Sequence, residues 1–258
     1  MLIPLRDHNP TQRVPVITIG LIVVNLLVFL REIAAGPDMH LFLARWGATP
    51  YELTSMIDLV GRVGQSQLVH VDGPSFLPVT AVTSMFLHGG WMHLLFNMHF
   101  LWIFGNNIED FLGPLRFLGF YLVAGLLGLA THVAIDPDSI IPTVGASGAI
   151  SGMLGAYLVL YPKARISSML FLGFFVQFLQ VPALLLISLW TVIQVLGGVT
   201  GLMIPGDSGG VAYWAHIGGF VAGFVVMKAF FRTSVAEAKL ASRWRQLPGR
   251  IENREWWR

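Results

Sequence analysis

The sequence TAVTSMFLHGGWMHLLFNMHFLWIFGNNI, residues 80–108, contains no Asp, Glu, Lys or Arg. A helix needs about 20 mostly apolar residues to cross the hydrocarbon core of a bilayer, so this stretch is long enough to span a membrane. Five more stretches also lack these charged residues: 14–30, 117–135, 139–162, 166–206 and 208–227. The pattern predicts a membrane protein built from several transmembrane helices.

The composition of the whole chain supports this prediction. Of its 258 residues, 55% are hydrophobic and only 12% are charged, whereas an ordinary soluble domain carries about 25% charged residues. That balance excludes a water-soluble globular protein. The chain contains no cysteine, which excludes a disulfide framework and a thiolate metal site.

The placement of Lys and Arg predicts the number and direction of the helices. Residues 166–206 could hold one transmembrane helix or two, and a seventh span would move the basic tail across the membrane. With six spans and both termini in the cytoplasm, every Lys and Arg lies on the cytoplasmic side except Arg31, Arg45 and Arg62, as the positive-inside rule requires. We therefore expect an all-α membrane protein with six transmembrane helices, at 14–34, 82–106, 115–135, 145–162, 183–203 and 211–231.

These spans divide the chain into three parts. We expect a cytoplasmic N-terminal segment at 1–13, a six-helix domain at 14–231 and a basic cytoplasmic tail at 232–258. Residues 166–181 are interpreted as an interfacial approach to the fifth span. The long first loop, 36–79, is expected either to rest in the outer leaflet or to form a small extracytoplasmic lobe.

Polar side chains within the predicted spans are candidates for function, because they are costly in a membrane. The second, fourth and sixth spans run in the same direction, so His93, Asn97, Ser147 and His216 are expected at a similar depth. His93 and Asn97 are four residues apart and share one helical face, where both could donate hydrogen bonds to an oxyanion. Ser147 is expected where a helix begins, and a serine there needs a base, for which His216 is the candidate.

Small residues around this cluster have a second interpretation. Gly145 and Gly148 flank Ser147 and would let a neighbouring backbone approach. Gly148-x-x-x-Gly152 and Gly219-x-x-x-Gly223 are also common patterns of plain helix packing in membranes. Packing alone does not require a nucleophile, a base and two hydrogen-bond donors at one depth, so the combination favours a catalytic site.

The segments around these residues resemble the rhomboid proteases. The resemblance rests on His88-Gly-Gly-Trp-Met-His93-Leu-Leu-Phe-Asn97, Gly145-Ala-Ser147-Gly148 and Ala215-His216-Ile-Gly-Gly219, in the family's order and on its second, fourth and sixth helices. It implies a six-helix rhomboid bundle in which Ser147 is the nucleophile and His216 the general base. It further implies that His93, Asn97 and the Ser147 backbone N–H hold the oxyanion, and that His88, Gly145, Gly148 and Gly219 have supporting roles.

The sequence departs from the family's pattern at Ser151, and the long first loop lacks a Trp-Arg pair. Some rhomboid proteases carry an aromatic residue four positions after the nucleophile, stacked on the catalytic histidine, but here that position is Ser151. No Asp or Glu occupies a helical position that could orient His216. We therefore expect a Ser–His dyad whose histidine is oriented by some other group.

The resulting prediction is an intramembrane serine endopeptidase. It would cut transmembrane protein substrates through an acyl-enzyme, within a prokaryotic inner membrane, with no cofactor, no metal and no nucleic-acid partner. The alternative is a non-proteolytic rhomboid-like binding protein or a transporter. A metalloprotease is disfavoured because no His-Glu-x-x-His pattern occurs.

A second serine motif is interpreted as a decoy. Gly206-Asp207-Ser208-Gly209-Gly210 matches the motif around the nucleophile of trypsin-like proteases. That family places its site on paired β-barrels, which nothing in this sequence predicts. Glycine pairs with Asp and Ser are ordinary turn residues, so Ser208 is expected to lie in a loop without a catalytic role.

Overall fold

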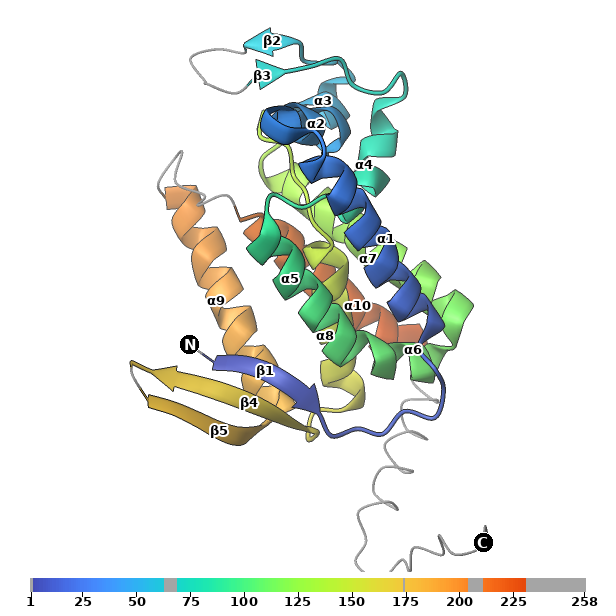
Figure 1. Ribbon diagram of the computed structural model, residues 1–258, viewed down its shortest axis with the longest axis vertical. Helices are drawn as coiled ribbons and strands as arrows, with labels where there is room; N and C mark the ends of the chain where they lie inside the picture. Colours follow the sequence, from blue (N-terminus) through green and yellow to red (C-terminus); the bar gives the residue numbers. More distant parts are fainter. Residues whose placement is uncertain (1, 63–68, 174, 204–210, 231–258) are drawn as a thin grey trace, which may run out of the picture.

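A computed structural model describes residues 2–62, 69–173, 175–203 and 211–230. The expected basic tail and the motif around Ser208 lie outside these residues. The longer helices of the described ranges are α1 (Val16–Ile33), α5 (Trp91–Phe100), α6 (Asn106–Leu112), α7 (Pro114–Ile135), α8 (Ser147–Leu160), α9 (Ala183–Met203) and α10 (Tyr213–Phe230). They form a bundle of roughly aligned helices (Figure 1).

Three helices in the described ranges are long and apolar enough to cross a membrane by themselves. These are α1, α7 and α9. Helices α8 and α10 coincide with the fourth and sixth predicted spans but are shorter than those spans. The predicted total of six transmembrane helices stays a prediction.

The second predicted span, 82–106, is wrong at both ends. Its first part is a short helix, α4 (Thr80–Thr83), followed by a 3-10 turn, η3 (Ser84–Phe86). The chain then becomes extended at Leu87 and turns at Gly90, whose φ of 156° favours glycine. Helix α5 starts only at Trp91 and continues through a π-helical segment, η4 (Leu101–Gly105), into α6. The Gly89-Gly90 pair is the physical reason for the late start.

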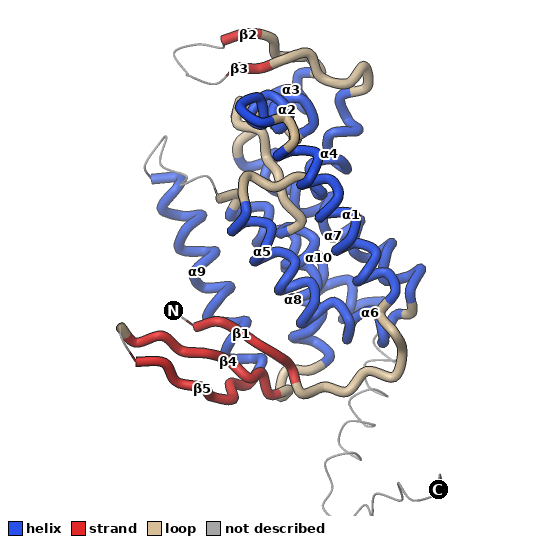
Figure 2. Tube along the Cα trace, viewed as in Figure 1, coloured by secondary structure: helices blue, strands red, loops and turns tan. Residues whose placement is uncertain are grey.

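A three-stranded antiparallel sheet corrects the expectation of an all-α protein. Its strands are β1 (Leu2–Asp7), β4 (Arg165–Leu172) and β5 (Phe175–Pro182), in the order β1-β4-β5. The interfacial approach expected at 166–181 is thus a β-hairpin, paired from Arg165 with Pro182 to Leu172 with Phe175. The sheet lies across one end of the bundle, beside the start of α9 (Figures 1 and 2).

The long first loop forms a small lobe at the opposite end of the bundle (Figure 2). It contains a 3-10 turn η1 (Gly36–Asp38), helices α2 (Met39–Trp46) and α3 (Pro50–Ser55), two short strands β2 (Gly61–Arg62) and β3 (Val69–His70), and a 3-10 turn η2 (Leu77–Val79). Ala48 pairs with Thr143 in an isolated β-bridge. Because Thr143 lies just before α8, this bridge ties the lobe to the chain that leads to Ser147. The loop is thus folded, and its expected place at the outer face of the membrane stays a prediction.

The centre of the bundle is α8, whose residues are all buried except Ser147 and Leu158. Helices α8 and α10 pack through glycine backbones. A Cβ atom placed on Gly219 would overlap the carbonyl oxygen of Gly148, and one on Gly223 would overlap that of Gly152. The predicted small-residue contact between these two helices is therefore confirmed.

Candidate active site

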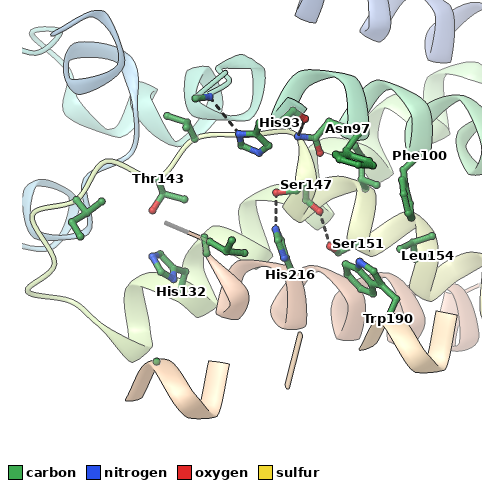
Figure 3. Close-up of a pocket in the computed structure, with 18 of the residues that line it drawn as sticks. His93, Asn97, Phe100, His132, Thr143, Ser147, Ser151, Leu154, Trp190 and His216 are labelled. Atoms are coloured by element: carbon green, nitrogen blue, oxygen red, sulfur yellow. Dashed lines mark hydrogen bonds between the residues drawn. The ribbon is translucent and has the colours of Figure 1, made fainter. Parts of the chain in front are cut away.

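Ser147 and His216 form a hydrogen-bonded pair. Ser147 is the first residue of α8, as the sequence predicts, and His216 lies in the first turn of α10. The Nε2 atom of His216 is 2.7 Å from the Oγ atom of Ser147, and the bond is drawn as a dashed line in Figure 3. The serine hydroxyl thus has an imidazole nitrogen within reach of its proton.

The glycines of α8 and α10 explain why these two side chains meet. Gly148 follows Ser147, and Gly219 lies three residues after His216 in the next turn of α10. Because the backbone of α10 touches the carbonyl of Gly148 at Gly219, the starts of both helices are held close together. Ser147 and His216 therefore lie at the same level of the bundle, as expected from the sequence.

His93 presents a hydrogen-bond donor toward the same place. Its Nδ1 atom accepts a hydrogen bond of 3.3 Å from the backbone N–H of Gly89, so the proton of the neutral ring is on Nε2. A Cβ atom on Gly145 would lie 2.8 Å from Cε1 and Nε2 of His93. Gly145 also has a φ of +127°. Glycine at position 145 therefore gives His93 the space next to Ser147.

Asn97 lies one turn further along α5, on the same face as His93 (Figure 3). Its Nδ2 atom donates a hydrogen bond of 3.0 Å to the carbonyl oxygen of His93. That bond uses one of the two N–H groups of the amide. The second N–H has the chemistry that an oxyanion needs, as does the Nε2–H of His93.

These four residues line a cavity of about 1000 Å³. It also extends past Trp190 of α9 and His132 of α7 to Leu2, Ile3 and Pro4 of strand β1. The cavity gives an extended chain room to reach Ser147. Sequence reasoning did not foresee that the N-terminal strand contributes to its wall.

His88 has a structural place beside the site. It is fully buried, and its backbone N–H donates to the carboxylate of Glu32 at 3.1 Å and 3.3 Å to the two oxygens. Its ring lies edge-on to that of His93, with 5.1 Å between the centroids. The backbone of His88 thus holds the chain before α5 against α1. The His88 ring packs against His93.

Two residues of α9 contact His216, and sequence reasoning did not identify either of them. The Oε1 atom of Gln194 is 2.8 Å from Nδ1 of His216. The ring of Trp190 lies 6.0 Å from the His216 ring, tilted by 35°. The signal that could have found Gln194 is a lone amide side chain in an otherwise apolar span, which usually indicates a specific partner.

The departure at Ser151 has a clear structural outcome. The Ser151 hydroxyl donates a hydrogen bond of 2.6 Å to the carbonyl oxygen of Ser147, within the same helix. Because the hydroxyl is engaged there, Ser151 does not orient His216. The aromatic neighbour of the histidine is Trp190, which comes from α9 instead of α8.

In the described ranges, no three His, Asp or Glu side chains gather so that they could hold a metal ion. A metalloprotease, the alternative disfavoured by the sequence, would need such a cluster. The described part of the chain gives that alternative no support.

The fold and the site together define a helical membrane protein with a hydrogen-bonded Ser–His pair in an internal cavity. A family model described as "Rhomboid domain" matches residues 78–233. The chain belongs to the rhomboid family, and the expected family resemblance is confirmed. A helical membrane fold is the fold of this family.

The relatives of this chain include proteins named as proteases. It is 32% identical to "Rhomboid-like protease 5" of Toxoplasma gondii over 187 residues, which are 68% of this chain and 18% of that protein. It is 42% identical to "Putative rhomboid protease YdcA" of Bacillus subtilis over 78 residues, or 30% of this chain and 38% of the relative. "Rhomboid protease GluP" of the same organism is 44% identical over 77 residues, 30% of this chain and 15% of the relative. In these matches the chain spans less than half the length of each relative.

Proposed function

We propose that this protein is an intramembrane serine endopeptidase that hydrolyses peptide bonds in or near transmembrane helices of other membrane proteins. The observation that carries the proposal is the 2.7 Å contact between Ser147 Oγ and His216 Nε2 inside a cavity. Relatives named as rhomboid proteases support it. Membership of the rhomboid family does not depend on these proposed residue roles.

In the proposed reaction, His216 Nε2 takes the hydroxyl proton as Ser147 Oγ attacks the peptide carbonyl carbon. The C–N bond then breaks, and the leaving amine takes the proton from His216. The product is an ester between Ser147 and the substrate. A water molecule, deprotonated by the same imidazole, hydrolyses this ester and returns the serine to its starting state.

The proposed oxyanion site has three donors. The carbonyl oxygen of the tetrahedral intermediate would accept hydrogen bonds from His93 Nε2–H, the Asn97 amide and the backbone N–H of Ser147. The first N–H groups of a helix have no partner within the helix, and Ser147 is the first residue of α8. The positive end of the α8 dipole further favours negative charge at this position.

The proposed substrates are membrane proteins whose helices unwind easily. The cavity reaches from Ser147 to strand β1, and a peptide bond of a helix must first give up its intrahelical hydrogen bonds to present its carbonyl to the serine. Small or helix-breaking residues near the cleaved bond lower the free energy needed for unwinding. We place the protein in a cell membrane of prokaryotic inner-membrane type, as a multi-pass protein with both termini in the cytoplasm and without a metal or cofactor.

The rival function is a rhomboid-like binding protein or transporter without protease activity. Such a protein needs neither a nucleophile nor a base. The hydrogen bond between Ser147 and His216, together with a donor from His93 on the same cavity, favours the protease.

Labelling with a fluorophosphonate, which acylates activated serines, tests the proposal. Purified full-length protein should be labelled, and Ser147→Ala should lose the label entirely because the attacking oxygen is gone. Ser208→Ala is the matched control and should keep the label, as should wild-type protein treated with a chelator. Label lost only in Ser208→Ala, or activity abolished by chelation, would overturn the proposed function.

A further inference from the structure

Gln194 has an amide side chain in a largely apolar part of α9. Its neighbours along the helix are Trp190, Ile193, Val195 and Leu196, whereas the Gln194 side chain is buried with 7% exposure. An amide in such a helix is expensive unless it finds a partner. Its partner is the imidazole of His216, with 2.8 Å between Oε1 and Nδ1.

The chemistry of this contact decides which nitrogen of His216 carries the proton. An amide oxygen only accepts hydrogen bonds, so the Nδ1 atom that faces it must donate. A neutral imidazole has one N–H, and with Nδ1 protonated the lone pair of Nε2 is free. That lone pair is the one that faces Ser147 Oγ at 2.7 Å. In the opposite tautomer, Nε2 would donate to the serine and could not take its proton.

We infer that Gln194 is the positioning residue of the proposed dyad: its amide oxygen holds His216 in the tautomer and orientation that accept the Ser147 proton. This inference rests on the proposed function and names the group that orients the base in place of an Asp or Glu. The same bond stabilises the imidazolium that forms when the proton is transferred, because a hydrogen bond to a charged group is stronger than one to a neutral group.

Trp190 supports the same arrangement from the preceding turn of α9. Residues four apart lie on one helical face, so Trp190 and Gln194 both face α10. The Trp190 ring lies 6.0 Å from the His216 ring and 6.5 Å from that of Phe220. One face of α9 therefore provides both a hydrogen-bond acceptor and a packing surface for the base.

The test uses full-length protein in detergent and two substitutions of similar size. Gln194→Met keeps the length of the side chain but removes the amide acceptor, whereas Gln194→Glu keeps an acceptor oxygen and adds a charge. Thr191→Val on the same helix is the matched control, since the Thr191 hydroxyl bonds only within α9, to the Ile187 carbonyl at 2.8 Å. The rate of fluorophosphonate labelling is measured from pH 5 to pH 9.

We expect Gln194→Met to slow labelling by about 10-fold to 100-fold, the effect of losing a hydrogen bond to a charged group. Thr191→Val should stay within about 2-fold of wild type, because it keeps the shape of the side chain and removes only a hydrogen bond within α9. Gln194→Glu should restore most of the rate, and the acidic limb of its pH profile should move to higher pH, because a carboxylate beside the ring stabilises the imidazolium.

A purely structural role for Gln194 predicts a different result. The Glu variant would then be no faster than the Met variant, and its pH profile would coincide with that of wild type; either outcome overturns the inference, as does a Met variant as fast as Thr191→Val. The pH profile of Gln194→Glu depends only on the molecules that are folded, so it decides the matter even if the Met variant does not fold. Failure of the proposed function is distinct, because it appears as labelling that survives Ser147→Ala.

Discussion

The two contacts that α10 makes on either side of His216 differ in kind. Toward α8, glycine backbones touch directly, with Gly219 against the carbonyl of Gly148. Toward α9, glycines face aromatic rings instead, with Gly197 against Tyr213 and Gly198 against Trp214. Backbone contact leaves no freedom of adjustment, whereas a ring can rotate. The distance between Ser147 and His216 is thus set by the rigid side of α10, and the orientation of the imidazole by side chains on the adjustable side.

Helices α8 and α9 also differ in how deeply they are buried. Almost the whole of α8 is buried. In contrast, α9 exposes Leu184, Leu185, Leu189 and Leu196, as expected for a helix with one face toward lipid. Helix α8 is central and carries the nucleophile, whereas α9 is outer and carries only the partner of the base. Substitutions in α8 should therefore reduce activity more than substitutions in α9.

Adding one methyl group on the rigid side is expected to reduce both activity and stability. Gly219→Ala places a Cβ atom onto the Gly148 carbonyl, so α10 must shift and carry His216 away from Ser147. A displacement of about 1 Å in a catalytic group can reduce the rate about 100-fold. We expect at least that loss in the cleavage of a membrane-protein substrate, together with a lower Tm in detergent.

The matched substitution on the adjustable side is Gly197→Ala. Its Cβ atom would lie 2.4 Å from Cε1 of Tyr213, and the tyrosine ring can move away. We expect a loss of activity of only about 3-fold, from overpacking that costs about 1 kcal/mol in stability, the low end of the usual range. Equal losses in the two variants would contradict the contrast between a rigid and an adjustable contact.

A loss confined to turnover is expected for Asn97→Ala. Loss of one oxyanion donor lowers kcat by about 100-fold to 1000-fold, or about 2.7–4 kcal/mol, while the dyad itself is untouched. Steady-state kinetics with a transmembrane substrate should show this loss in kcat with little change in KM. Leu95→Ala, on the exposed face of the same helix, should leave both constants near wild type. A change confined to KM would mean that Asn97 binds substrate and does not stabilise the oxyanion.

The smallest expected effect concerns Asp7, far from the dyad, where β1 meets the bundle. Burial raises the pKa of the Asp7 carboxyl, although hydrogen bonds from Tyr157 and Asn107 partly oppose the shift. A raised pKa in the folded protein means that stability falls as the pH rises from about 3.9, the usual Asp value, through the raised pKa. Asp7→Asn removes this titration.

We therefore expect the Tm of wild type to fall relative to that of Asp7→Asn as the pH is raised through that range. The difference should be no more than about 2–4 °C, the shift that 1 kcal/mol produces in a protein of this size. Thermal denaturation followed by tryptophan fluorescence from pH 4 to pH 8 measures it. A relative Tm that rises with pH would show that the hydrogen bonds outweigh the burial of Asp7.

Much of the helical bundle could be predicted from the sequence because each span is a local property. A charge-free stretch of sufficient length indicates a helix without knowledge of its neighbours, although residues 166–206 also hold the β4–β5 hairpin. Gly145 and Gly148 marked the start of α8 at Ser147. The positions of Ser147 and His216 followed from helix direction alone. The catalytic roles of these two residues, and those of His93 and Asn97, remain predictions.

Most of the features that sequence reasoning missed depend on contacts between distant segments. Strand β1 has only six residues, and its partner β4 lies about 160 positions later. A pairing over that distance leaves no pattern within either short segment that sequence reasoning could detect. The orientation of Gln194 depends on how α9 is rotated about its axis, which an almost uniformly apolar helix does not reveal. The late start of α5 was the exception, since Gly89-Gly90 is a local signal that the charge-free stretch concealed.

The pairing of β1 with β4 also has a consequence for the order in which the chain can assemble during synthesis. Ile3 faces Met169 in the sheet, and a ribosome that adds about 5–20 residues per second needs about 10–30 s to produce the later partner. Asn107 and Tyr157, which bind Asp7, emerge earlier. Asp7 can therefore be anchored to the bundle first and hold the waiting strand close to where β4 will arrive.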